Sequence, residues 1–338
     1  MYELSVSKKE IGRAGDRLVS QLKIDEKYDD GDVDILHQWR MLHLYPLNRI
    51  KFFLERESKL VNKNSLISSR IKRLPSIVGK LSRFPEMKLN KMQDLGGCRA
   101  ILDNIEQVYN LKDKLLRLKF SHKLARKDDY IENMKDSGYR SFHMVYSFQN
   151  DRYPQFNGLK IEIQIRTAIQ HSWATAVEMV GLFRNESLKS SMGDIRWLRF
   201  FKLVSELFYK IESKESSGSY NAISDELREL CKALNVFYIL NAYNQVVSHI
   251  EGSEHYKKGF CIILLDTKAG KINIKKFDVQ NNIQAAKFYI NAEKHCSENK
   301  DCEVAMVSVS SIGELKNAYP AYFLDTKTFL NNLSRFIF

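Results

Sequence analysis

Two short segments of the chain alternate apolar and polar residues as β-strands do. The segment GLKIEIQIRT begins at Gly158, and alternation with a period of two places its successive side chains on opposite faces. The residues of its apolar face are Leu159, Ile161, Ile163 and Ile165. Those of its polar face are Lys160, Glu162, Gln164 and Arg166.

The second alternating segment, GYRSFHMVYSF, begins at Gly138. The residues expected in the core are Phe142, Met144, Tyr146 and Phe148, and those expected to point away from it are Tyr139, Ser141 and His143. A solvated antiparallel sheet gives the same pattern, so the alternation predicts two strands without defining a site.

Helical spacing marks two other stretches, and mixed strands and helices are expected between them through about residue 180. The stretch ILHQWRMLHLYPLNRIKFFLERESKL from Ile35 has apolar residues three and four apart on both sides of Pro46, and residues 194–212 repeat this period. The Ser/Gly-rich run ESSGSYN from Glu215 follows and is the best candidate boundary. We therefore predict two domains, residues 1–215 and 216–338.

The expected second domain is a small α+β module. Residues 225–251 predict a long, largely buried helix, and GFCIILLDTKAGKINIKKF from Gly259 predicts a hairpin that turns at Ala269 and Gly270. A helix over residues 283–295, the strand CEVAMVSVS from Cys302 and C-terminal helical turns complete the module.

Composition indicates an ordinary globular protein, with 44% hydrophobic and 28% charged residues. No segment has the apolar length of a bilayer span or a signal peptide, so we expect a cytoplasmic protein without a membrane partner. The net charge of +12 favours a polyanionic partner, and residues 51–91 hold eleven Lys or Arg against three Asp or Glu. Such a run also forms ordinary solvated helix faces.

Five scattered cysteines argue against a disulfide framework and for a reducing compartment. The closest group, His295, Cys296 and Cys302, lacks a second pair of ligands at the spacing of a zinc site. We therefore expect the thiols to be core or surface residues.

Two further segments, SRIKRLPSIVGKLSRF from Ser69 and QDLGGCRAI from Gln93, precede the two alternating segments. In this order, over residues 69–173, the four resemble the synthetase domain of the RelA/SpoT family. The resemblance implies an α/β (α+β) fold, a nucleotidyltransferase-like mixed β-sheet flanked by helices. It also implies a Mg²⁺-dependent pyrophosphokinase (diphosphokinase) that transfers pyrophosphate from ATP to a ribose 3′-hydroxyl.

The resemblance assigns ATP binding to the first two of these segments. Arg70 and Arg99 match the pair of arginines that sandwich the adenine ring, a role that suits a planar guanidinium. The residues that match the triphosphate-binding positions are Lys72, Ser76, Lys80 and Arg83. Without the resemblance, the same basic residues read as the surface of a helix.

Two carboxylates match the acidic positions associated with magnesium and with activation of the hydroxyl, Asp94 and Glu162. Glu162 would accept the proton of the attacking 3′-hydroxyl or orient it. Its alternative role is that of a cross-strand partner for a basic side chain.

The acceptor side follows from the third and fourth segments. Tyr139 matches a tyrosine that stacks on the acceptor base, although a packed tyrosine is the alternative. Lys135 and His143 match phosphate contacts, and Gly138 gives the loop its backbone freedom. The strand motif is completed by Gln164 and Arg166.

The tail and WRMLHLYPLN from Trp39 are similar to the CapRel group of fused toxin–antitoxin proteins. This likeness implies antiviral defence: a C-terminal pseudo-zinc-finger region blocks the nucleotide site through Tyr319 and Tyr322, and a phage protein such as a capsid protein releases it. The acceptor there is the 3′-CCA end of tRNA.

Three alternatives stay open. The acceptor can be GDP or GTP, which would make the enzyme a (p)ppGpp synthetase of guanosine tetraphosphate metabolism. The chain can also be an inert nucleotide-binding sensor. Tyr319 and Tyr322 can simply be aromatic anchors for the last helix.

Overall fold

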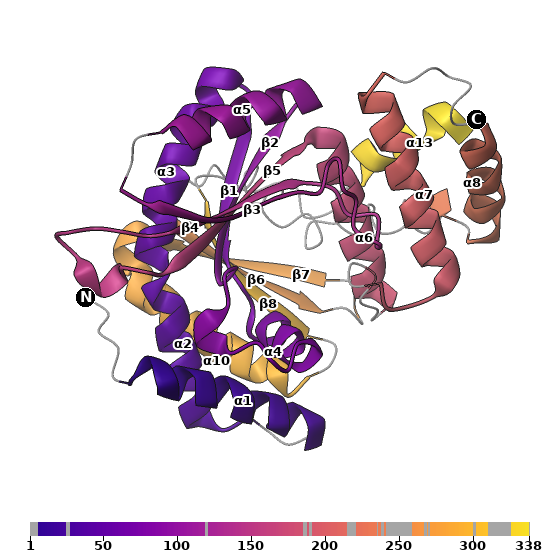
Figure 1. Cartoon of the computed structure of the whole chain (residues 1–338). Helices are drawn as coiled ribbons and strands as arrows, with labels where there is room; N and C mark the ends of the chain where they lie inside the picture. The colour runs from indigo at the N-terminus through magenta and orange to yellow at the C-terminus, as the bar shows by residue number, and fades with distance from the viewer. Residues whose placement is uncertain are drawn as a thin grey trace.

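The described strands of this computed structural model form one mixed sheet of eight, flanked by helices. The structure describes residues 6–24, 28–118, 121–184, 188, 191–214, 221–234, 236–237, 240, 259–266, 269, 271–299, 302–309 and 326–337. The sheet confirms the expected mixed α/β fold (Figure 1).

The strand order is β3-β4-β5-β2-β1-β8-β6-β7. The bounds are β1 Leu66–Ile71, β2 Gly96–Leu102, β3 Lys123–Asp129, β4 Phe142–Ser147, β5 Lys160–Thr167, β6 Gly259–Asp266, β7 Lys271–Asp278 and β8 Cys302–Val309. Among these strands β2 and β5 pair in parallel, and the other neighbours pair antiparallel.

The helices lie around this sheet (Figure 1). Their bounds are α1 Lys8–Ile24, α2 Asp30–Leu42, α3 Leu44–Val61, α4 Leu74–Arg83, α5 Ile105–Arg117, α6 Ala168–Arg184, α7 Ile195–Glu212, α8 Asn221–Ala233, α10 Asn282–Ser297 and α13 Lys327–Ile337. Short 3₁₀ turns are η1 Leu89–Lys91, η2 Pro154–Phe156 and η5 Val279–Asn281. Within the described part of the chain, no helix has the length and apolar character that crossing a bilayer requires.

The apolar faces predicted for the two alternating segments are buried as expected. In β5 the side chains of Ile161 and Ile165 are fully buried, and in β4 so is Met144. They share one core with residues of α1 to α5. The opposite face of these strands is therefore free to carry polar chemistry, which is where the candidate site lies.

The helical stretch predicted from Ile35 is present as two helices, α2 and α3, which meet at His43. Pro46 lies in the first turn of α3, where its missing N–H costs no helical hydrogen bond. The helix predicted over residues 194–212 is confirmed as α7, and the Asp194 side chain caps it by accepting a hydrogen bond from the backbone N–H of Arg196.

The predicted hairpin is confirmed as the antiparallel pair β6 and β7. The C-terminal strands continue the sheet of the first half, because β8 pairs with β1 at Arg70 and Val307. The helix predicted over residues 225–251 is described as α8, Asn221–Ala233, and most of its expected remainder lies outside the described residues. A division at residue 215 stays a prediction.

The expectation of isolated thiols is wrong for one pair. Cys296 at the end of α10 and Cys302 at the start of β8 form a disulfide with a Cα–Cα distance of 4.8 Å. The short connection between the two elements brings the cysteines together. Cys98 and Cys231 are free and buried, as expected of core residues.

Candidate active site

A polar cavity of about 590 Å³ lies over the sheet face opposite the core of β4 and β5. The lining residues that the sequence singled out are Arg70, Lys72, Lys80, Asp94, Arg99, Lys135, Tyr139, His143, Glu162 and Gln164. They come from β1, α4, β2, β4, β5 and the loops between them. The fold thus brings four separate sequence segments to one cavity.

Asp94 lies just before β2 and pairs with two lysines. Its Oδ2 is 2.9 Å from the Nζ of Lys72, which follows β1, and 2.9 Å from the Nζ of Lys80 on α4. Burial favours the neutral carboxyl group, but the two lysines outweigh it and hold the pKa of Asp94 well below its usual range. Burial lowers the pKa of Lys72, against the attraction of Asp94. Asp94 is therefore an ionised carboxylate at neutral pH.

The second oxygen of Asp94 is suited to a cation. Oδ1 is buried and has no hydrogen-bond partner among the described residues. Those residues also hold no cluster of three or more His, Cys, Asp or Glu that could enclose a metal. Mg²⁺ commonly takes one or two carboxylates and completes its shell with water and substrate phosphates. The donors present, Asp94 and the nearby Glu162, fit that mode of binding.

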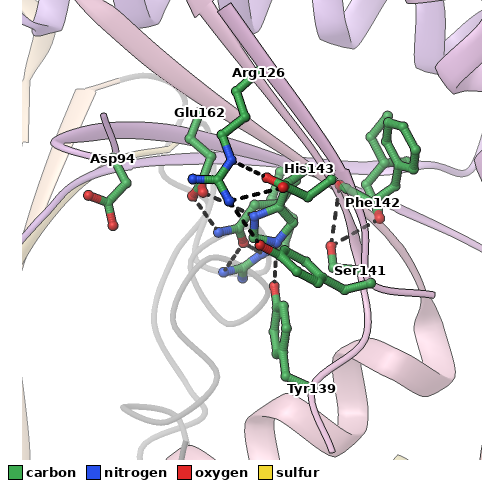
Figure 2. A network of polar contacts seen from close by, with 12 residues as sticks. Asp94, Arg126, Tyr139, Ser141, Phe142, His143 and Glu162 are labelled. Atoms are coloured by element: carbon green, nitrogen blue, oxygen red, sulfur yellow. Dashed lines mark hydrogen bonds and ion pairs between the residues drawn. The ribbon is translucent and has the colours of Figure 1, made fainter. Parts of the chain in front are cut away.

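On the other side of the cavity, four side chains form a hydrogen-bonded row (Figure 2). The Tyr139 hydroxyl is 2.9 Å from His143 Nε2, and His143 Nδ1 is 3.0 Å from Glu162 Oε1. Gln164 donates from Nε2 to Glu162 Oε2 at 2.7 Å. The row exists because β4 and β5 pair His143 with Gln164 and Val145 with Glu162, which places these polar side chains on the same face.

Electrostatics make this row an ion pair. Burial disfavours the charged forms, but Tyr139 and Glu162 raise the pKa of His143 to about 9. Burial also raises the pKa of Glu162, but the attraction of His143 outweighs it and lowers that pKa to about 2. Between these pH values His143 is cationic and Glu162 anionic. With so low a pKa, Glu162 is a weak general base and is better suited to orienting a hydroxyl or a cation.

The row should make stability depend on pH. The pKa of His143 is raised from 6.5 to about 9, so its stabilising contribution is fully present below pH 6.5 and is lost as the pH rises through about 9. We expect His143→Gln to lower the free energy of unfolding by about 1–3 kcal/mol more below this window than above it. Denaturant unfolding of both proteins on either side of the window measures this. An equal difference at both pH values would contradict the charged pair.

Tyr139 is more buried than the sequence suggested. Only 7% of its surface is exposed, and its ring lies among aromatic residues, tilted against Trp173 at 6.5 Å between centroids. The expectation that Tyr139 points away from the core is therefore wrong. The Nζ of Lys135 is 5.3 Å from the centre of the Tyr139 ring, so the predicted loop lysine lies close to it.

Gly138 precedes this tyrosine with a φ of +90°, a conformation that favours glycine. A Cβ there would come within 2.9 Å of Trp173 Cζ2 and 3.1 Å of the Cα of Lys202. The loop thus needs glycine because it lies close to α6 and α7.

Apart from Gly138, three predicted site residues of the described part of the chain lie outside the cavity lining. Arg166 is 2% exposed, its Nη2 contacts His171 Nδ1, and burial followed by repulsion from Arg99 lowers its pKa to about 9. Ser76 is half-buried on α4, and Arg83, exposed at the end of α4, donates from Nε to the backbone oxygen of Gly79. Tyr319 and Tyr322 lie outside the described residues.

The cavity also contains residues that the sequence did not reveal. Arg126 and Asp128 of β3 pair at 2.7 Å, and Tyr130 follows them in the lining. β3 has the sequence KLARKDD and is an exposed edge strand, so its residues do not alternate between apolar and polar. The hydrophobic pattern therefore could not predict this strand. Phe84 and Met87, after α4, supply apolar surface to the same cavity.

Comparison with known proteins agrees with this geometry. Residues 69–185 match the family described as "Region found in RelA / SpoT proteins". The matched residues include most of the cavity lining.

Two curated relatives come from Bacillus subtilis (strain 168). GTP pyrophosphokinase YjbM is 32% identical over 111 residues, which cover 32% of this chain and 52% of that protein. GTP pyrophosphokinase YwaC is 30% identical over 132 residues, which cover 37% of this chain and 62% of that protein. The chain thus spans about half to three fifths of the length of these relatives.

Among solved structures, the chain is similar to the small alarmone synthetase 1 from Bacillus subtilis bound to its product pppGpp. The TM-score is 0.44 at 23% identity, over 52% of this chain and 94% of that chain. We draw nothing further from a likeness at this level.

Proposed function

We propose that the protein is an ATP-dependent pyrophosphokinase that transfers a pyrophosphoryl group to a ribose 3′-hydroxyl. One observation carries the proposal. A single cavity holds an ionised aspartate with a free oxygen beside two lysines, and a tyrosine–histidine–glutamate row also lines it. Pyrophosphoryl transfer requires charge compensation on the donor phosphates and a positioned acceptor hydroxyl, and the two groups of side chains offer one requirement each.

The donor end of the cavity is formed by β1, α4 and the start of β2. Lys72 and Lys80 would compensate the phosphates of ATP, and Arg70 and Arg99 line the cavity where they would contact the adenine. Bound Mg²⁺, held by Asp94 and Glu162, would supply further compensation of phosphate charge. Asp94 keeps the two lysine side chains in place before the substrate arrives.

In the transfer, the ribose 3′-oxygen bonds to the β-phosphorus of ATP while the bond from that phosphorus to the α-phosphate oxygen breaks, and AMP leaves. Each carboxylate oxygen has two lone pairs, so Glu162 can accept a hydrogen bond from the 3′-hydroxyl in addition to its bonds with His143 and Gln164. Its low pKa makes this an orienting contact, and the hydroxyl proton passes to solvent. Tyr139 and Lys135 would hold the acceptor nucleotide.

The acceptor that we propose is the 3′-CCA end of tRNA. The net charge of +12 supports this choice, since tRNA presents many phosphates and GTP only three. The edge strand β3 also supports tRNA as the acceptor. Its basic residues Lys123, Arg126 and Lys127 are exposed, and Arg126 also lines the cavity. A basic strand therefore leads from the surface of the molecule to the acceptor side.

GDP or GTP is the second candidate acceptor. The specific observation in its favour is the description of YjbM and YwaC as GTP pyrophosphokinases. Such an enzyme would make (p)ppGpp and would use the same donor site and the same tyrosine. The two candidates therefore differ in what occupies the acceptor side.

Acceptor choice is tested by offering the full chain ATP labelled at the γ-phosphate, with deacylated tRNA and GDP/GTP in parallel. The proposal predicts label on tRNA, and no label on tRNA whose terminal ribose has been oxidised with periodate. Label in guanosine tetra- or pentaphosphate alone would replace tRNA with GDP/GTP. The full chain is needed because truncation after residue 215 would remove three strands of the sheet.

We also propose that the C-terminal region holds the enzyme at a low basal activity until a phage protein binds to it, so that the full activity stops translation during infection. A trigger needs only to bind the open state more tightly than the closed one. About 5.5 kcal/mol of differential affinity moves an equilibrium from 1% to 99% open.

Within this proposal, Tyr322→Ala should raise the basal activity of the purified chain. Loss of an inhibitory ring contact shifts the equilibrium toward the open state without any trigger, by about tenfold for each 1.4 kcal/mol. Labelled-ATP turnover without a trigger measures the change, and Tyr322→Phe, which keeps the ring, separates the ring from the hydroxyl. Equal basal activity in the wild type and in the Tyr322→Ala variant would remove the tyrosine from the inhibitory contact.

A further inference from the structure

The first turn of α4, the helix that carries Lys80, is held by a residue far away in the sequence. The backbone N–H of Leu74 donates to Oε1 of Glu293 on α10 at 2.9 Å, and the two residues are 219 positions apart. Arg73, at the N-cap position of α4, makes no side-chain capping bond, and Pro75 follows with no N–H to offer. Glu293 therefore satisfies an N-terminal backbone donor that the local sequence leaves unpaired.

Glu293 is itself fixed by a buried polar cluster. Its Oε2 is 2.7 Å from Nη1 of Arg40 on α2, and the Tyr289 hydroxyl donates to its Oε1 at 2.8 Å. The Arg40 and Glu293 side chains are 0% and 2% exposed. Burial favours the neutral acid, but Arg40 outweighs it and lowers the pKa of Glu293. A carboxylate charge is thus held at the positive end of the α4 dipole.

His37 completes the cluster as a neutral group. Burial lowers its pKa to about 4, so at neutral pH its Nδ1 can accept the hydrogen bond from Arg40 Nη1 at 3.1 Å. The charges of Arg40 and Glu293 then balance each other inside the protein. Figure 1 shows α10 with α2 and α4 on the same side of the sheet.

We propose that Glu293 is a positioning residue for the donor nucleotide, acting through α4. The contact lies two residues after Lys72 and six before Lys80, the lysines that flank Asp94 in the cavity. If the hydrogen bond to Glu293 were lost, the first turn of α4 would loosen and both lysines would be displaced relative to Asp94. The C-terminal half of the chain thereby builds part of the ATP site, and this inference rests on the proposed function.

Single replacement of Glu293 would leave Arg40 buried and unpaired, and such a variant can fail to fold. Two double variants avoid this problem. Arg40→Met with Glu293→Gln removes both charges and keeps a side-chain oxygen that can accept from Leu74. Arg40→Met with Glu293→Met removes both charges and the acceptor. The two variants lose the ion pair alike, so their difference isolates the contact with α4.

The test measures binding of a non-hydrolysable ATP analogue by calorimetry, together with hydrogen exchange at the Leu74 amide. We expect the Met/Met variant to bind the analogue about fivefold more weakly than the Met/Gln variant, which is about 1 kcal/mol, the usual effect of losing a helix cap. Its Leu74 amide should also exchange faster. In turnover, the KM for ATP should rise while the KM for the acceptor stays unchanged.

A control variant removes the N-terminal cap of a different helix, α5. Asn104→Ala deletes the side chain that accepts from the backbone N–H of Gln107 at the start of α5, which contributes no residue to the cavity. It should lower stability without changing analogue affinity. Equal affinity and equal exchange in the Met/Gln and Met/Met variants would overturn the inference. Absence of analogue binding by the wild type would instead count against the proposed function.

Discussion

Asp94→Asn is expected to lower kcat/KM for pyrophosphoryl transfer by on the order of a hundredfold or more. The substitution keeps the size of the side chain but removes the charge that pairs with Lys72 and Lys80 at 2.9 Å each. It also weakens the buried Oδ1 of Asp94, which has no hydrogen-bond partner among the described residues and is suited to a cation. Both donor-side functions of the cavity therefore depend on this charge.

Steady-state kinetics with varied ATP and Mg²⁺ measure this prediction. We expect the concentration of Mg²⁺ that gives half-maximal rate to rise as well, since a cation ligand is lost. Asp113→Asn on α5 is the matched control, because Asp113 is an exposed carboxylate that pairs with Lys112 and contributes nothing to the cavity. Wild-type kcat/KM in Asp94→Asn would show that the donor phosphates are bound elsewhere.

Glu162→Gln should have an effect of similar size on activity while the protein still folds. Glutamine can preserve the hydrogen bonds to His143 and Gln164, at 3.0 and 2.7 Å, while losing the negative charge. Without that charge the pKa of His143 falls toward its ordinary value, and the acceptor hydroxyl loses a strong hydrogen-bond acceptor. We expect kcat to fall by about a hundredfold or more.

Thermal unfolding of this variant separates catalysis from folding. Glu229→Gln, an exposed position on α8, is the control for removing a glutamate charge outside the cavity. A Glu162→Gln protein that unfolds cooperatively above the assay temperature and has lost activity supports the assignment. A folded variant with full activity would leave Glu162 as a cross-strand partner and nothing more.

The sequence predicted the sheet interior well because burial repeats every second residue. Ile161, Ile163 and Ile165 are buried as expected, and the polar face between them carries Glu162 and Gln164 into the cavity. The same alternation could not reveal that Arg166 is buried against α6, since that depends on the path of the chain after the strand.

Contacts between distant elements could not be predicted from the sequence, because local residue patterns do not record them. Tyr139 is buried because Trp173, from a different element, packs against it, and no local pattern records that meeting. Strand β1 pairs with β8 as well as with β2, and backbone hydrogen bonding of this kind is independent of side-chain identity. Likewise, the sequence on either side of Glu293 does not predict that this residue caps α4.

The number of cysteines in the sequence did not predict the disulfide. An odd number of scattered thiols pointed away from disulfides, yet Cys296 and Cys302 lie six positions apart on adjoining elements and pair. Sequence spacing alone does not fix the Cα–Cα distance, which is 4.8 Å here because α10 leads directly back into the sheet.

The identity of the transferred group tests the central claim most directly. The full chain would be incubated with an acceptor mixture of tRNA and GDP/GTP and with ATP labelled either at the γ-phosphate or at the α-phosphate. Pyrophosphoryl transfer predicts acceptor label from γ-labelled ATP, none from α-labelled ATP, and one AMP released for each group transferred. Incorporation of the α-label would mean nucleotidyl transfer, and release of ADP with the γ-label would mean transfer of a single phosphate. Either result would contradict the account.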